Sequence, residues 1–373
     1  MGEVAPSYYI GLMSGTSLDG IDTVLATFEN NSLQVHHALC YPFDNEVRNQ
    51  INQILSPDWR GSLLEYGHID QVLGIQFANA VLTLLEQTNT NPKQVKAIGS
   101  HGQTLCHAPT VGLPFTLQAG DPNQISERTG IPVVADFRRR DMAASGQGAP
   151  LVPAFHRAVF FSPDVNRTVL NIGGIANLTV LSKNGDAPVY GFDTGPGNTL
   201  IDQWAFKYTG QHYDKNGDWG RTGTINTEIL EAMLKDPYFK LAPPKSTGRE
   251  HFNLGWVAQK IGHREIIPQD IQATLTELTA ITISQSLQEQ APQTQELVLC
   301  GGGVHNQLLW ERIQQHCPNI KLFSTQDLGA NPDWVEAIAF AWFAKQTLEG
   351  KPSNMPPVTG AKGARVLGGI YPA

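Results

Sequence analysis

A stretch of small residues between two β-type runs near the start of the chain constrains the fold more than any other feature. Residues Ile10–Asp22 read IGLMSGTSLDGID, between an apolar run at Tyr8–Met13 and a second β-rich run at Ile21–Phe28. Small residues let a backbone approach a ligand closely, and free N–H groups and hydroxyls in such a turn form a concavity for an anion such as phosphate. An ordinary hairpin loop is the alternative. The candidate phosphate-binding residues are Ser14, Gly15, Thr16, Ser17, Leu18, Asp19, Gly20, Ile21 and Asp22.

The spacing of this turn excludes the two commonest nucleotide-binding loops. Gly15 and Gly20 have the spacing of a Walker loop, but Ile21 and Asp22 stand where that motif needs Lys and Ser or Thr. A dinucleotide fingerprint needs G-x-G-x-x-G before a helix, whereas this turn leads into a strand. A strand–turn–strand phosphate loop is instead typical of the hexokinase/actin-type ATPases, in which two related domains each supply a hairpin.

Two later segments fit that interpretation. Residues Arg167–Leu181, RTVLNIGGIANLTVL, form a second apolar hairpin with Gly173 and Gly174 at its turn and Asn171 as a polar handle. Residues Glu296–Asn306, ELVLCGGGVHN, predict a strand, a glycine turn and a helix; Gly301, Gly302, Gly303 and Asn306 would let a purine lie against the backbone. We therefore predict an α/β, two-domain hexokinase/actin-like ATPase fold with the active site in the interdomain cleft.

Periodicity places the other elements around these turns. Strands are predicted at 8–13, 21–29, 33–41, 95–99 and 131–137, and helices at 63–87, 271–288 and 331–347, with a short helix capped by Asp121 and Pro122. We expect a first domain over residues 1–134 and a second over 135–357. The tail at 358–373 would return to the first domain, with a strand near 364–370.

Composition is typical of an enzyme that acts on small molecules. The net charge of −8 disfavours nucleic acid as a partner. No apolar run approaches the ~20 residues of a membrane span, and the first residues show no signal peptide. The four cysteines, which form no CxxC pair, are expected to be reduced thiols in a cytoplasmic protein. The histidines form no HExxH motif, so a structural zinc site is not expected.

Six segments make the chain resemble the anhydro-N-acetylmuramic acid kinases, a bacterial cell-wall recycling family of the sugar-kinase/actin superfamily. They are GLMSGTSLDGID (11–22), SHGQT (100–104), DFRRRDMAASGQGAPLVPAFH (136–156), NIGGIANLT (171–179), GFDTGPGN (191–198) and CGGGVHN (300–306). The order of the segments is that of the family. Ser145 departs from it, because the family usually has glycine there.

Asp193, in GFDTGPGN, is the candidate catalytic base. It follows a predicted strand and precedes a Gly/Pro turn, which is where α/β folds place catalytic groups. A carboxylate near the acceptor assists phosphoryl transfer to a hydroxyl. The resemblance assigns the general base to this aspartate, and a structural role as a cap of the following turn is the alternative.

The sugar-binding candidates come from two polar segments and from Asn198. Three consecutive arginines at 138–140 suit an acidic sugar, because guanidinium groups bind carboxylates in bidentate fashion. A solvated surface run paired with its flanking aspartates is the alternative. The predicted substrate-binding residues are His101, Gln103, Thr104, Arg138, Arg139 and Asn198.

The resemblance also implies a reaction. The family opens the 1,6-anhydro bridge of 1,6-anhydro-N-acetylmuramic acid with water, phosphorylates O6 with ATP and Mg²⁺, and releases N-acetylmuramic acid 6-phosphate and ADP for peptidoglycan recycling. It further favours a homodimer, whereas the composition described above predicts a cytoplasmic protein that binds neither membrane nor nucleic acid. The residues themselves leave two alternatives open, namely another sugar or acetate kinase of the same fold and a non-enzymatic actin-like ATPase scaffold.

Overall fold

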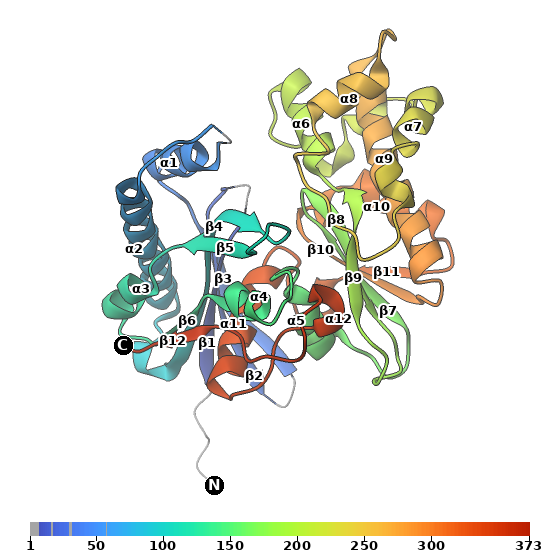
Figure 1. Cartoon of the computed structure of the whole chain (residues 1–373). Helices are drawn as coiled ribbons and strands as arrows, with labels where there is room; N and C mark the ends of the chain where they lie inside the picture. Colours follow the sequence, from blue (N-terminus) through green and yellow to red (C-terminus); the bar gives the residue numbers. More distant parts are fainter. Residues whose placement is uncertain (1–6, 16–17, 30–31, 57) are drawn as a thin grey trace. The chain divides into compact units, whose positions relative to one another are not determined.

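The computed structural model describes residues 7–15, 18–29, 32–56 and 58–373, and the chain forms two compact units (Figure 1). Unit 1 comprises Met1–Val159 and Trp334–Ala373, and unit 2 comprises Phe160–Asp333. Within the described residues, no helix has both the length and the apolar character that a membrane span requires.

Unit 1 is built on a seven-stranded mixed sheet (Figure 1). Its main path, in spatial order, is β12 (Gly369–Tyr371), β6 (Val133–Ala135), β4 (Val95–Ala108), β1 (Tyr8–Ser14), β2 (Ile21–Glu29) and β3 (Ser32–Tyr41), and β5 (Phe115–Ala119) pairs with β4. Strands β1, β2 and β3 form an antiparallel meander, whereas β1, β4 and β6 are parallel. The helices of the unit are α1 (Asn45–Leu55), α2 (Leu63–Thr88), α3 (Pro122–Thr129), α4 (Phe137–Ala143), α5 (Val152–Phe160), α11 (Val335–Leu348) and α12 (Pro356–Thr359).

Unit 2 repeats this plan with a five-stranded sheet. Its strands, in spatial order, are β11 (Lys321–Ser324), β10 (Glu296–Cys300), β7 (Arg167–Ile172), β8 (Ile175–Leu181) and β9 (Tyr190–Pro196). Strands β7, β8 and β9 form the antiparallel meander, and β7, β10 and β11 are parallel. The helices are α6 (Thr199–Thr209), α7 (Thr227–Leu234), α8 (Leu254–Ile261), α9 (Pro268–Gln290) and α10 (Gln307–His316). The α/β fold class predicted from the two hairpins is confirmed, and each hairpin opens the sheet of its own unit.

Helix α2 forms where the apolar periodicity predicts it. Ser62 caps its N-terminus and exchanges hydrogen bonds with Glu65 in a capping box, and Asn89 ends it in a left-handed conformation. The apolar stripe that includes Leu73, Phe77 and Val81 is buried in the core of unit 1. The cap and the buried stripe together fix both the start of the helix and the face that it packs on the sheet.

Two glycines let α11 lie unusually close to the sheet of unit 1. A Cβ atom on Gly11 would lie 1.8 Å from the carbonyl oxygen of Ala337, and one on Gly99 would lie 1.9 Å from that of Phe340. Helix α11 packs on β1 and β4 through this contact. Gly11 therefore serves helix packing.

Some element boundaries differ from those predicted. Strand β4 continues past Gly99 through residues 100–108, because it pairs with β1 as far as Gln103 and with β5 from Gln103 to Ala108. The strand expected at 131–137 ends at Ala135, because Asp136 adopts a left-handed conformation that starts α4, and the three arginines lie on that helix. Helix α11 begins at Val335, after a turn, rather than at Asn331.

The units also divide the chain differently from the predicted boundaries at 134/135 and 357/358. Residues 135–159 belong to unit 1, because α4 follows directly from β6 in its sheet. Residues 334–357 also belong to unit 1, because α11 covers β1 and β4. The chain end does return to this unit, where β12 pairs with β6.

Candidate functional site

Asp193 lies on β9, opposite Asn177 of β8, and its carboxylate is held by an irregular segment of unit 2. The backbone N–H of Thr247 donates to Asp193 Oδ2 at 3.0 Å, and the backbone N–H of Asp193 donates to the carbonyl of Lys245 at 3.2 Å. Burial raises the pKa of the Asp193 carboxyl to about 6, although the Thr247 hydrogen bond and the positive charge of Lys245 act against this rise. At neutral pH the group is ionised and close enough to its pKa to take up a proton, which is the property that a general base needs.

The segment that holds Asp193, residues 245–250 with the sequence KSTGRE, was not predicted to be functional. Its Lys245 ammonium lies 5.0 Å from the ring centroid of Tyr238, whose hydroxyl donates to the backbone carbonyl of Asp193 at 2.8 Å. The only signal in the sequence is a pair of cations around small residues, without helical or strand periodicity. Such a pattern indicates a loop but does not show which strand it packs against.

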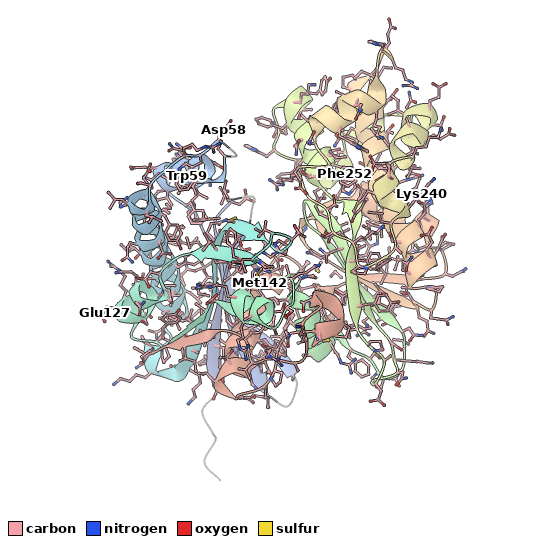
Figure 2. All side chains as sticks on the ribbon, in the orientation of Figure 1. Asp58, Trp59, Glu127, Met142, Lys240 and Phe252 are labelled. Atoms are coloured by element: carbon pink, nitrogen blue, oxygen red, sulfur yellow. The ribbon has the colours of Figure 1, made fainter. Side chains whose placement is uncertain are left out.

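Buried aromatic and carboxylate groups anchor this segment. Phe252, labelled in Figure 2, is fully buried among the rings of unit 2 and stacks on Phe239 at 5.6 Å. The carboxylate of Asp236 accepts hydrogen bonds from the Trp256 indole at 2.8 Å and from the Tyr238 backbone N–H at 3.1 Å. Burial acts against ionisation of Asp236, but these donors hold its pKa below the usual value. The segment beside Asp193 is therefore fixed at its base by a buried anion.

The second predicted phosphate turn, at Gly173 and Gly174, packs against the start of α6. The backbone N–H of Asn198 donates to the carbonyl of Gly173 at 2.8 Å, and that of Thr199 to Gly174 at 3.1 Å. The Asn198 side-chain amide donates to the carbonyl of Ile172 at 3.0 Å. Asn198, predicted to bind the sugar, thus holds the turn in place with this amide hydrogen.

The glycine segment after β10 lies against β7. A Cβ on Gly301, whose φ is +79°, would lie 2.4 Å from Asn171 Oδ1, and one on Gly303 would lie 2.3 Å from the side chain of Ile172. These glycines are therefore required by close approach to β7. The predicted contact with a purine is a separate expectation that this packing does not test.

A cavity of about 440 Å³ opens beside the glycine segment within unit 2. It brings together three residues predicted for the nucleotide or sugar, namely Asn198, Gly302 and Asn306. Sequence reasoning missed the rest of its lining, which is Asp202, Tyr213, Asp214, Lys215, Asn216 and His305. Its polar side chains and the ring of Tyr213 suit a nucleoside.

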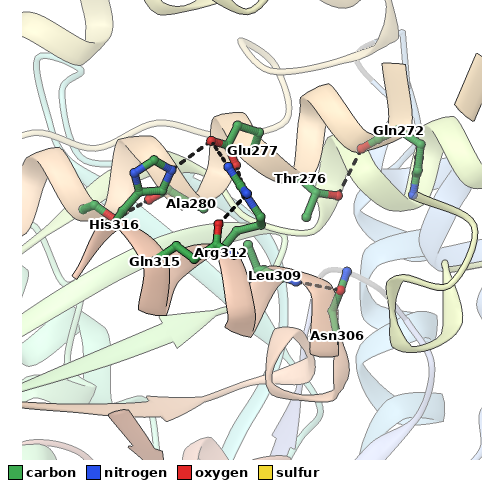
Figure 3. A network of polar contacts seen from close by, with 10 residues as sticks. Gln272, Thr276, Glu277, Ala280, Asn306, Leu309, Arg312, Gln315 and His316 are labelled. Carbon is green, nitrogen blue, oxygen red and sulfur yellow. Dashed lines mark hydrogen bonds and ion pairs between the residues drawn. The ribbon is translucent and has the colours of Figure 1, made fainter. Parts of the chain in front are cut away.

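Asn306 also fixes the helix that follows this cavity. Its side-chain oxygen accepts from the N–H of Leu309 at 3.0 Å and so caps α10. Farther along α10, Arg312 and His316 both contact Glu277 of α9, at 2.7 and 2.8 Å (Figure 3). Burial opposes ionisation of Glu277, but the hydrogen bonds from these partners hold its pKa below the usual value. The pair of helices behind the cavity is thus locked by an ionised cluster.

The first predicted phosphate turn lies in unit 1, at the end of β1. Ser14 donates to Gln103 Oε1 at 2.6 Å, and both side chains are buried. Leu18 is buried in the core with a φ of +58°, a strained conformation for a branched side chain. Gly20 packs against β3, where a Cβ would lie 2.6 Å from the sulfur of Cys40.

The remaining members of this turn have varied surroundings. Asp19 is exposed and its carbonyl accepts from Arg48 at 3.4 Å, Ile21 is a core residue, and Asp22 forms a cross-strand pair with Cys40. Gly15 closes the turn by accepting from the N–H of Leu18 at 3.4 Å. Thr16 and Ser17 lie outside the described residues.

Two sugar candidates of unit 1, His101 in the middle of β4 and Arg138 on α4, contact each other. The Arg138 Nε–H donates to His101 Nε2 at 2.9 Å, so this nitrogen accepts and the ring proton is on Nδ1. Burial and then the charge of Arg138 hold the pKa of His101 well below its usual value, so the ring is neutral. Nδ1 has no hydrogen-bond partner within the described part of the chain. His101 and Arg138 therefore form a hydrogen-bonded pair, in which the His101 Nδ1–H has no partner among the described residues.

The other members of this group are engaged elsewhere. Arg139 is mostly exposed and pairs with Asp136 at 2.7 Å. Gln103 accepts from Ser14, and Thr104 accepts from Gln118 at 3.2 Å. Of the three arginines, Arg138 is thus the one that α4 directs toward the predicted sugar residues.

Comparison with known proteins agrees with this arrangement of motifs. A family model described as anhydro-N-acetylmuramic acid kinase matches residues 7–373. A relative of that name from Xylella fastidiosa is 48% identical over 98% of this chain and 96% of its own length, and one from Photobacterium profundum is 48% identical over 98% of both chains. Component A of (R)-2-hydroxyglutaryl-CoA dehydratase from Acidaminococcus fermentans, a solved structure, is 11% identical over 91% of this chain and 99% of its own, with a TM-score of 0.48.

Proposed function

The chain belongs to the anhydro-N-acetylmuramic acid kinase family, and from this premise we propose that it opens the 1,6-anhydro bridge of 1,6-anhydro-N-acetylmuramic acid and phosphorylates O6 with ATP. Water attacks the anomeric carbon, the bond from that carbon to O6 breaks, and O6 takes the γ-phosphoryl group. The products are N-acetylmuramic acid 6-phosphate and ADP. Peptidoglycan recycling is the process that such a reaction serves.

The single observation that carries this proposal is the state of Asp193. Its carboxylate is partly buried, its pKa is raised to about 6, and it lies on the strand that pairs with the second hairpin. We assign it the role of the base that takes the proton from the attacking water. A free surface aspartate that only capped a turn would have no reason to keep such a pKa.

The nucleotide and the sugar are assigned to the clusters described above. The turn at Gly173 and Gly174 would bind phosphate, and the cavity that Gly302 and Asn306 line would take the adenosine. In unit 1, the first turn would contact phosphate, and His101 with Arg138 would contact the sugar, with the guanidinium facing its lactyl carboxylate.

Mg²⁺ fits this site as an ion carried by the nucleotide. Among the described residues, no group of three or more acidic, histidine or cysteine side chains is placed to hold a metal. Mg²⁺ commonly binds through one or two carboxylates, phosphate oxygens and water. When bound, it would neutralise charge on the phosphates. We further propose a homodimer in the cytoplasm, where ATP is available; both follow from the family resemblance.

A test of the function is ADP release by the purified protein with three sugars, namely the anhydro-sugar, N-acetylmuramic acid and glucose. We expect rapid release with the anhydro-sugar only. The Asp193→Asn variant should lose about 10²–10⁴-fold in turnover, whereas Asp186→Asn, which changes an exposed aspartate of the same unit, should not. Equal turnover with glucose would indicate another sugar kinase, and no sugar-dependent release would indicate a scaffold ATPase.

A further inference from the structure

Arg249 lies directly over the second phosphate turn. Its terminal nitrogen would be 3.4 Å, and its Nε 3.5 Å, from a Cβ atom placed on Gly174. The residue is exposed to solvent. Nothing in the sequence placed this arginine near a glycine 75 positions earlier.

The positive charge of Arg249 has no ion-pair partner within the described part of the chain. No ion pair or hydrogen bond is found there for its guanidinium, whereas Arg167, Arg221 and Arg312 of the same unit each pair with a glutamate. The backbone of Arg249 is nevertheless fixed, because its carbonyl accepts from the Asn253 amide at 3.3 Å. A fixed backbone with a free guanidinium beside a glycine turn is suited to an anion that binds on that turn.

The segment that carries Arg249, residues 245–250, also contacts Asp193, the proposed base. Thr247, two residues earlier, donates its N–H to Asp193, and the Lys245 carbonyl accepts from the Asp193 N–H. Residues 245–250 therefore connect the turn predicted for phosphate to the carboxylate predicted to activate water. A displacement of the segment would move both the cation and the hydrogen bond to the base.

From this geometry, and resting on the proposed kinase function, we infer that Arg249 binds the terminal phosphate groups of ATP on the Gly174 turn and stabilises the charge of the transferring γ-phosphoryl group. In that step the O6–phosphorus bond forms and the bond from phosphorus to the β,γ-bridging oxygen breaks. ADP leaves with the bonding electrons, and the guanidinium is unchanged. Arginines in equivalent electrostatic roles contribute about 10³–10⁵-fold to turnover in other phosphoryl-transfer enzymes.

The experiment compares three adenosine ligands of increasing phosphate charge. Calorimetry measures the affinity of adenosine, ADP and a non-hydrolysable ATP analogue for the wild type and for Arg249→Gln. We expect unchanged adenosine affinity, a loss of about 10- to 100-fold for the ATP analogue, as removal of a charged hydrogen bond predicts, and a fall in kcat. Arg264→Gln is the matched control, because Arg264 is another exposed arginine of unit 2, 3.6 Å from Glu228.

Two further variants separate phosphate binding from a structural role. Arg249→Lys, which keeps the charge, should show intermediate affinity for the ATP analogue, and added guanidinium ion should restore part of the turnover of Arg249→Ala. If Arg249→Gln matches the wild type in ATP affinity and kcat, or if it weakens adenosine as strongly as ATP while Arg249→Lys does the same, the inference is wrong. Failure of the wild type itself to bind ATP would instead overturn the proposed function.

Discussion

Replacing Asp193, the proposed base, should make the protein more stable and much less active. The pKa of Asp193 is raised from 3.8 to about 6 in the folded protein. A difference of this size corresponds to about 3 kcal/mol between the two protonation states, since each pKa unit is worth about 1.4 kcal/mol. Asparagine in this position has no charge to bury, and its side-chain oxygen can still accept the Thr247 hydrogen bond.

The sign of the effect depends on pH. Between pH 3.8 and about 6 the folded state binds more protons at Asp193 than the unfolded state, so the free energy of unfolding falls as pH rises through this window. Below the window Asp193 is protonated in both states, so its burial removes no free energy of unfolding through a buried charge. Above it the full cost of about 3 kcal/mol is present. Asp193→Asn should therefore stabilise unit 2 at pH 7.5 and change its stability far less near pH 4, at the lower edge of this window.

Urea denaturation at the two pH values measures this difference, and Asp236→Asn is its matched control. Asp236 is a buried aspartate of the same unit whose pKa is held below the usual value by its donors. Removal of that charge should destabilise the protein at pH 7.5, and this loss should shrink as pH falls through the low pKa. If Asp193→Asn lowers stability at pH 7.5, or gains equally at both pH values, the electrostatic account of this site is refuted.

Three other predictions follow from single contacts. Lys245→Met should raise the pKa of Asp193 above about 6 and move the acid limb of the kcat/KM profile to higher pH, because the Lys245 charge opposes that rise; Lys240→Met should leave the limb in place. Gly99→Ala should destabilise unit 1 by about 1–3 kcal/mol in thermal denaturation, because its Cβ would overlap the carbonyl of Phe340, whereas Gly67→Ala, where a Cβ meets nothing within 4 Å, should not. Ser145→Gly should stabilise the protein by about 1 kcal/mol, because Ser145 has a φ of +70°; a destabilised variant in urea denaturation would count against that strain.

The two hairpins could be predicted because their signal is local. Each combines apolar alternation with small residues at the turn, so strand, turn and strand are all visible within some fifteen residues. The repetition of the sheet order in the two units was only hinted at, because it depends on which strands pair across long separations. Ser145 shows a similar limit. A serine in place of the family glycine indicates that the backbone conformation at this position matters. Only the structure gives that conformation, which is left-handed.

The boundaries that were wrong depend on pairing partners. The alternation of β4 alone does not show that the strand will run on past Gly99 and pair with β5 from Gln103. The three arginines follow β6 closely enough to look like a strand end, but a left-handed Asp136 turns them onto a helix. Gly301 and Gly303 were predicted to lie against a purine, and the structure adds a packing reason for them, contact with Asn171 and Ile172, that no local pattern could give.

The properties of Asp193, the proposed base, could not be predicted at all, because they depend on an irregular segment that is more than fifty residues away in sequence. Burial alone would raise the pKa of Asp193 further, and the N–H of Thr247 and the charge of Lys245 bring it back to about 6. These two groups are positioned by backbone hydrogen bonds, which any residue type can make. The sequence therefore identifies the carboxylate, whereas its readiness to accept a proton depends on the packing of the segment that also carries Arg249. A variant that loosens this segment should consequently alter the pH profile and the ATP affinity together, although neither Asp193 nor the phosphate turn has changed.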